Sequence, residues 1–323
     1  MPGLMKQLVL RSARGGAFAG CVALLERLGD RRANLLRVLT YHRIDEPDAS
    51  RQLHPGLISA TPAEFTLQME HLASRCRAVS MQDALAAFRE TLPLPPRSVL
   101  ITFDDAYADF AQHAWPVLRR LGLPATLFVP TAYPDRPQQA FWWDRLHRAV
   151  HGANGRAVLP TPLGPFPVGD ASSRQRTLRR LSGHVKSLPH RDTLEFIESV
   201  CNGETVSANG VLGWAELRRL AGEGLTLAPH SRTHPLFSRL PLDEARAEAV
   251  GSRADLEREI GPPPPVFAYP SGAFTAATAG MLREEGFELA FTTRRGVNAV
   301  ASADPLRLRR INVGRHTSLP LLR

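Results

Sequence analysis

The sequence predicts an α/β fold built on a parallel sheet, and two observations point to it. Short apolar runs with β-branched residues alternate with longer segments whose apolar residues recur every three or four positions. In the clearest case, a strand at residues 99–101, a helix at 107–121 and a strand at 125–129 form a β-α-β unit. The two strands of such a unit run parallel, and 323 residues suit one large α/β domain or two small ones.

Seven short apolar segments are predicted as strands, with helices between them. The predicted strands are residues 35–42, 99–101, 125–129, 224–229, 266–269, 287–292 and 308–313. Helix boundaries are marked by a capping box at Thr61 and Glu64, by a second start at Ser80, and by Gly122 at the end of helix 107–121. Gly261 and the four prolines after it end a long helix at 242–260.

Residues 131–212 interrupt this alternation. Pro and Gly are dense at 160–169, and helices are predicted around them at 141–150, 172–188 and 192–200. We interpret the stretch as a helical insertion. Its aromatic cluster at Phe141, Trp142 and Trp143 allows two interpretations, stacking on a sugar ring or anchoring of the insertion to the core.

The domain prediction has two parts. Residues 1–34 form an N-terminal helical segment, and 35–323 form the main domain, with candidate catalytic motifs from about residue 97. The apolar run at 17–25 is too short to cross a bilayer, and no clear signal peptide precedes it. The basic N-terminus suits an amphipathic helix at a membrane surface or a helix packed on the domain. We therefore expect a cytoplasmic protein, either free or at the inner membrane surface.

The chain is basic, with a net charge of +9, and residues 1–43, 171–191 and 294–323 each carry +6. Basic segments attract acidic glycans, lipid headgroups or nucleic acid, but no basic-aromatic or recognition-helix pattern is present, so we expect no nucleic-acid partner. Almost every basic residue is Arg, so the base composition of the gene is an alternative explanation of the positive charge. The cysteines, Cys21, Cys76 and Cys201, are far apart and form no C-x-x-C pair, so we expect neither a disulfide framework nor a cysteine metal site.

Two adjacent carboxylates, Asp104 and Asp105, follow the strand at 99–101. A buried pair of like charges needs a cation or a shared proton to compensate it. The ordinary alternative is a turn that caps the following helix.

Two histidines, His230 and His234, follow another predicted strand about 125 residues later. Imidazoles four residues apart can face one way on a helical turn and bind one cation. Two His and one Asp form a three-ligand set for a zinc-like ion with one position open for water. The other Asp of the pair, which is not a ligand, would then serve as general base on that water.

The motifs Thr102-Phe103-Asp104-Asp105 and His230-Ser231-x-x-His234 resemble those of the polysaccharide deacetylases, the NodB-homology enzymes of carbohydrate esterase family 4. The resemblance covers about residues 35–316. It implies a distorted (β/α)7-type TIM-like barrel with a helical insertion. It also implies metal-dependent removal of N-acetyl groups from hexosamines of a polysaccharide, an exopolysaccharide or envelope glycan. Asp104 would be the catalytic base, and one divalent ion would be bound by Asp105, His230 and His234. Zinc is the ion we expect, with other divalent ions as alternatives.

The resemblance also implies a substrate-binding set: His42, Tyr269, Ser271 and Gly272. In the segment 268–272, the backbone N–H of Ser271 would stabilise the oxyanion, and Gly272 would let the backbone approach the sugar. Ala268 stands where the common family form has an Arg that steadies the base. The motif here has the shorter form Tyr-Pro-x-Gly, at residues 269–272, and this form indicates the subgroup that acts on exopolysaccharides.

The general acid that protonates the leaving amine stays open between His316 and His42. His316 has the family's position near the C-terminus, and His42 ends the first strand, where barrel sites collect functional groups.

Three other functions remain as alternatives. They are a glycan-binding pseudoenzyme on the same scaffold, a hydrolase of a small cyclic amide, and an iron oxygenase with two His and one carboxylate.

Overall fold

The computed structural model describes residues 33–47, 53–90, 92–152, 155, 157–201 and 210–317. The predicted N-terminal helical segment lies outside the described residues except for its last two. No helix in the described part of the chain is both long and apolar enough to cross a bilayer.

Four parallel strands form the centre of the main sheet, in the order β1 (Leu35–Tyr41), β5 (Ser98–Phe103), β6 (Ala125–Val129) and β9 (Thr226–Pro229). All residues of β5 and β6 are buried, which is why both strands are mainly apolar and do not alternate apolar with polar residues. Three shorter strands extend this sheet. They are β4 (Arg77–Ala78) beside β5, and β12 (Asn298–Ala299) and β13 (Ile311–Asn312) beside β1.

The remaining barrel strands, β10 (Val266–Ala268) and β11 (Leu289–Phe291), form a separate parallel pair. Phe291 of β11 forms a β-bridge with Leu308. A few residues later the chain forms β13, which pairs with β1. In the described residues no backbone ladder joins β9 to β10. The imidazole Nδ1 of His230 instead lies 2.7 Å from the carbonyl oxygen of Ala268. Seven strands thus form a distorted ring that is open between β9 and β10, and the predicted α/β class is confirmed.

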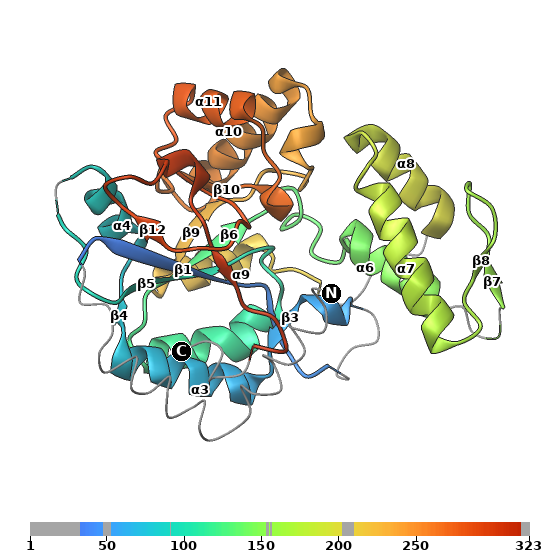
Figure 1. Cartoon of the computed structure of the whole chain (residues 1–323), viewed down its shortest axis with the longest axis horizontal. Helices are drawn as coiled ribbons and strands as arrows, with labels where there is room; N and C mark the ends of the chain where they lie inside the picture. The colour runs from blue at the N-terminus through green and yellow to red at the C-terminus, as the bar shows by residue number, and fades with distance from the viewer. Residues whose placement is uncertain are drawn as a thin grey trace, which may run out of the picture.

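Helices cover the outside of this ring. They are α3 (Pro62–Arg75), α4 (Met81–Phe88), α5 (Trp115–Arg120), α9 (Trp214–Gly222), α10 (Leu242–Glu259) and α11 (Ala276–Glu284). Figure 1 shows α3 on one side of the sheet and α10 and α11 on the other. The capping box of Thr61 and Glu64 is formed, and Ser80 caps α4 in the same way with Asp83.

The shorter elements complete the chain. They are the strands β2 (Arg43–Ile44) and β3 (Ile58–Ala60), and the 3₁₀ turns Pro55–Leu57, Phe237–Arg239, Pro270–Gly272 and Pro305–Arg307.

Two predicted elements differ from the structure. The helix expected at 107–121 is a π-helical stretch, Phe110–Ala114, followed by the short α5. Pro116 has no N–H to donate inside this helix, which accounts for the wider turn before it. The last strand, expected at 308–313, is reduced to Ile311–Asn312, because Leu308 bridges to β11 and the Arg310 N–H bonds to the Arg294 carbonyl.

A group of helices between β6 and α9 stands apart from the central sheet (Figure 1). It contains α6 (Trp142–His151), β7 (Val158–Leu159), β8 (Phe166–Pro167), α7 (Ala171–Val185) and α8 (His190–Cys201). These elements share a small apolar core of their own that includes Leu146, Leu181 and Ile197. The predicted helical insertion therefore exists as helices in the expected places, while the division at residue 34 stays a prediction.

A buried hydrogen-bond network anchors this insertion to the barrel. The Tyr107 hydroxyl donates to the Asp144 carboxylate at 2.7 Å and accepts from the indole N–H of Trp143, also at 2.7 Å. The backbone N–H of His54 donates to the other Asp144 oxygen at 2.6 Å. Trp143 and Asp144 belong to α6, so the first turn of the insertion is fixed to the barrel beside the carboxyl ends of its strands.

Candidate metal centre

The candidate site residues come from the carboxyl ends of different parallel strands. His42 follows β1, Asp104 and Asp105 follow β5, and His230 follows β9. Because parallel strands end at the same edge of a barrel, residues more than 100 positions apart in the sequence meet there.

Three donor atoms converge at this edge. The Asp105 Oδ1 lies 3.2 Å from the His234 Nε2 and 3.5 Å from the His230 Nε2. Ligands about 2.0–2.1 Å from a tetrahedral ion lie about 3.4 Å from one another, so these separations fit a zinc-sized cation. All three residues are buried, and the Asp105 Oδ1 has no hydrogen-bond partner. Within the described ranges, this is the one group of three or more His, Cys, Asp or Glu residues whose ligand atoms all lie within 4.8 Å of one another.

The hydrogen bond from His230 to the sheet fixes its tautomer. A carbonyl oxygen can only accept, so the Nδ1 that lies 2.7 Å from the Ala268 oxygen must carry a proton. In the neutral imidazole, the Nε2 that faces Asp105 is then the unprotonated nitrogen, the form that binds a metal. The contact that bridges β9 and β10 therefore also orients one ligand.

The backbone around the donors is strained. Asp105, Ala106, Ser231 and His234 have φ angles of 73°, 51°, 65° and 60°, in the left-handed region that non-glycine residues rarely adopt. Such conformations cluster at functional sites, where the surrounding structure holds them. The two histidines lie in a loop with positive φ angles at Ser231 and His234, so the expectation that a helical turn aligns them is wrong.

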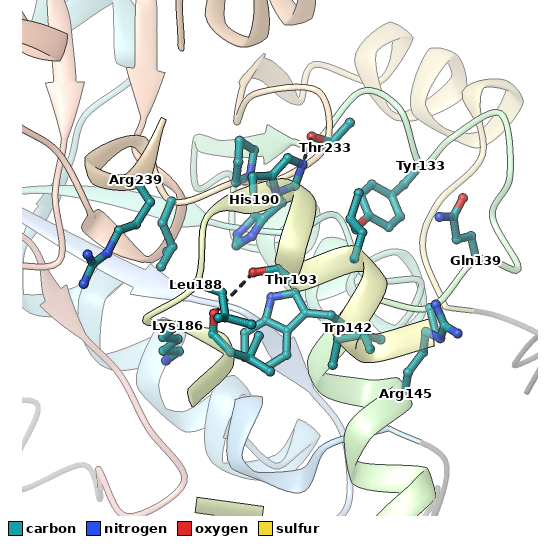
Figure 2. Close-up of a pocket in the computed structure, with 17 residues that line it drawn as sticks. Tyr133, Gln139, Trp142, Arg145, Lys186, Leu188, His190, Thr193, Thr233 and Arg239 are labelled. Carbon is teal, nitrogen blue, oxygen red and sulfur yellow. Dashed lines mark hydrogen bonds between the residues drawn. The ribbon is translucent and has the colours of Figure 1, made fainter. Parts of the chain in front are cut away.

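Helix α10 holds this histidine loop in place. The Glu248 carboxylate accepts the backbone N–H groups of Arg232 and Thr233 at 2.7 and 2.8 Å, and the Thr233 hydroxyl at 2.7 Å. From the other side, His190 of α8 lies 3.2 Å from the Thr233 hydroxyl, a contact drawn in Figure 2. The loop that carries His234 is thus fixed by both the barrel and the insertion.

The second carboxylate, Asp104, has a different partner. The fully buried guanidinium of Arg310 donates to both Asp104 oxygens, at 2.8 and 2.6 Å. A third bond from the Arg310 Nε to the Thr292 carbonyl, at 2.9 Å, fixes the direction of the guanidinium. Arg310 therefore places a buried cation beside Asp104, although the Arg that the family resemblance led us to expect at position 268 is replaced by Ala268.

The electrostatics separate the roles of the two carboxylates. Burial alone would raise the pKa of Asp104, but the Arg310 guanidinium, helped by His230, holds this pKa below its usual range. Burial also opposes ionisation of Asp105, yet His234 and His230 hold its pKa well below the usual range. Burial lowers the pKa of His234, which favours the neutral imidazole that binds metals. Both carboxylates are therefore ionised near neutral pH, and Asp105 lies where a cation would be held.

A cavity of about 570 Å³ opens above these residues. His42, Asp104, Asp105, His230, His234 and Ser271 line it on the barrel side, and Trp142 and Trp143 line it from the insertion. The Trp143 ring packs against the His234 ring, with 4.8 Å between the ring centroids. A smaller cavity of about 60 Å³ shares Trp142, Lys186 and His234 with the first and lies against α8 (Figure 2).

Three predicted residues do not line the large cavity. The Tyr269 ring is buried in the core, and its hydroxyl donates to the Leu306 carbonyl at 3.1 Å. Gly272 supports the turn, because a Cβ there would lie 2.4 Å from the Thr293 backbone nitrogen. His316 is exposed, with the Arg315 Nε 3.2 Å from its ring. His42, by contrast, faces the cavity near both carboxylates.

Metal binding gives the first test of this site. At a free zinc concentration about 100 times Kd, the folded chain should gain about 2.7 kcal/mol of stability and a higher Tm. Asp105→Asn removes the charged donor and should abolish this rise. His42→Gln should keep it, because His42 lines the cavity without being one of the three donors. An equal zinc-induced rise in Asp105→Asn would contradict the assignment.

Comparison with known proteins gives matches over most of the chain. The family model described as polysaccharide deacetylase matches residues 91–155 and 175–290, together more than half of the sequence. The poly-β-1,6-N-acetyl-D-glucosamine N-deacetylase of Escherichia coli K12 is 22% identical over 270 residues. That match covers 83% of this chain but only 35% of the relative, so the chain spans about a third of its length.

Solved structures show the same fold. The deacetylase PplD of Streptococcus pyogenes matches with a TM-score of 0.62 and 19% identity, over 90% of this chain and 97% of that one. IcaB of Ammonifex degensii matches with a TM-score of 0.57 and 22% identity, over 90% and 95% of the two chains. With the extent of the family match, these findings lead to one conclusion: the chain belongs to the polysaccharide deacetylase family.

Proposed function

We propose that the chain hydrolyses the N-acetyl group of hexosamine residues in a glycan, with a divalent metal ion held by Asp105, His230 and His234. The observation that carries the proposal is the convergence of these three donors beside Asp104, an ionised carboxylate that is not one of them. Family membership and the similarity to an N-deacetylase of an N-acetylglucosamine polymer support the reaction class.

Zinc suits this donor set, and such an ion lowers the pKa of a bound water towards neutrality and polarises a carbonyl group. The chain's own residues would do the rest. Asp104, held ionised by Arg310, would accept a proton from the attacking water. Ser271, at the cavity wall with a φ of 53°, would direct its N–H towards the developing oxyanion.

For the general acid we favour His42. It lines the cavity, lies close enough to Asp104 and Asp105 to influence both pKa values, and could donate a proton to the leaving amine. His316 is not among the residues that line the cavity, although it has the family's position near the C-terminus.

Acetate release tests the proposed function directly. The zinc-loaded chain should release acetate from N-acetylglucosamine oligomers, and a chelator should abolish the release. Asp104→Asn should lower the rate at least about a hundredfold, since a general base contributes that much or more. The variant should still bind zinc, which separates loss of the base from loss of the metal. An undiminished rate in Asp104→Asn would reject the assignment.

The arginine beside the base predicts a change in pH dependence. Arg310→Lys keeps a positive charge but loses the bidentate contact, so the pKa of Asp104 should rise. Because the base must be ionised, the acidic limb of the kcat/KM profile should move to higher pH, with activity least affected at high pH. Arg309→Lys, at the exposed neighbouring arginine, is the matched control. An acidic limb that stays in place would contradict the role given to Arg310.

The two candidate acids can be separated by parallel substitutions. His42→Gln should lower kcat about a hundredfold, as expected when a general acid is removed, and should flatten the alkaline limb of the pH profile. His316→Gln should leave both kcat and the profile near those of the unmodified chain. The opposite pattern would move the role of acid to His316.

A further inference from the structure

One wall of the large cavity comes from the insertion, not from the barrel. Helix α7, with its C-cap residue Lys186, contributes a single stripe of residues at helical spacing. The stripe consists of Gln175, Leu178, Arg179, Ser182, Gly183 and Lys186. The opposite stripe of α7, which includes Thr177, Leu181 and Val185, is buried against the insertion's own core. Because that burial fixes the rotation of the helix, α7 presents the first stripe to the cavity.

The stripe carries two cations without partners. Arg179 and Lys186 are exposed, and in the part of the chain that the structure describes neither has an ion pair or a side-chain hydrogen bond. Other arginines of the same helix are engaged elsewhere. Arg176 bonds to Ser172, and Arg180 lies over the Phe166 ring at 5.0 Å. Arg176 and Arg180 also do not line the cavity.

The cavity has no free negative charge to balance these cations. Its only acidic lining residues among those described are Asp104 and Asp105. Arg310 neutralises the first, and the second belongs to the candidate metal set. A cleft lined by one sign of charge concentrates ligands of the opposite sign. The side of the cavity that faces the metal donors is therefore positive.

The spacing of the two cations sets the scale of the ligand. Arg179 and Lys186 are seven residues apart, so two helical turns, about 10.5 Å along α7, separate their backbone positions. Between them Ser182 and Gly183 present little side chain, which leaves room for a ring against the helix. A planar guanidinium can bind a carboxylate or a phosphate through two hydrogen bonds, whereas an ammonium acts as a point charge.

We infer that the substrate is an anionic N-acetylhexosamine glycoside, with a uronate carboxylate or a phosphate near the scissile amide that binds Arg179 and Lys186 on α7. The inference rests on the deacetylase function proposed above and names its substrate class. It gives the insertion a role in selecting the glycan, while the barrel carries the chemistry.

Two matched pairs of probes test the inference and distinguish the two anions. One pair is a hyaluronan tetrasaccharide and its uncharged methyl ester. The other is N-acetylglucosamine 1-phosphate and the neutral methyl glycoside. Titration calorimetry on the zinc-loaded full chain measures each Kd. At low salt, the charged member of at least one pair should bind about tenfold tighter, and added salt should reduce the difference.

Variants locate the effect on α7. The double substitution Arg179→Gln and Lys186→Gln should remove the preference for the charged probe and leave the Kd of the neutral probe unchanged. Arg176→Gln, which removes a charge from the same helix outside the cavity, should retain the preference. Equal affinities within both pairs would overturn the inference, and so would a preference that survives in the double variant.

Failure of this inference can be distinguished from failure of the proposed function. Acetate release from a neutral N-acetylglucosamine pentamer, without any charge preference in binding, would keep the deacetylase function and reject the anionic substrate. A charge preference that depends on Arg179 and Lys186, without acetate release from either type of probe, would keep the binding wall and reject the catalytic proposal.

Discussion

Two adjacent carboxylates, Asp104 and Asp105, are buried at the end of one strand, and the rest of the site compensates their charge. Neither could stay ionised there alone, because burial favours the neutral form. The structure gives them different nearest partners, a guanidinium for Asp104 and two imidazoles for Asp105. This separation makes two chemically different groups from two identical side chains. One is ion-paired with Arg310, and the other faces two imidazoles, where a cation would be held.

The same contacts also hold the barrel together. The ring of strands has no backbone ladder between β9 and β10, and His230 connects the two there through the Ala268 carbonyl. Arg310 lies on the segment between β11 and β13, and its bonds to Asp104 and Thr292 connect that segment to β5 and β11. A polar side chain of the site thus joins β9 to β10, and Arg310 adds side-chain bonds to the backbone contacts of its own segment. Changes at these residues should affect stability as well as chemistry.

The sequence was informative where functional residues directly follow strands. Asp104, Asp105, His230 and His234 could be placed at one edge, because apolar runs of strand length precede them. Arg310 could not be found this way. It comes from a segment where the predicted strand is interrupted, and only its position across the barrel relates it to Asp104. Contacts that depend on how the insertion packs are likewise invisible in sequence spacing, and this holds for the α7 stripe and for Trp143 against His234.

The central claim is that Asp105, and not Asp104, joins the two histidines around a metal ion. A crystal of the zinc-loaded chain, measured at the zinc absorption edge, tests this most directly. The account predicts one anomalous peak within about 2.0–2.3 Å of Asp105, His230 and His234, with Asp104 still bound by Arg310. A peak coordinated by Asp104, or zinc bound elsewhere while these three donors stay empty, would contradict it.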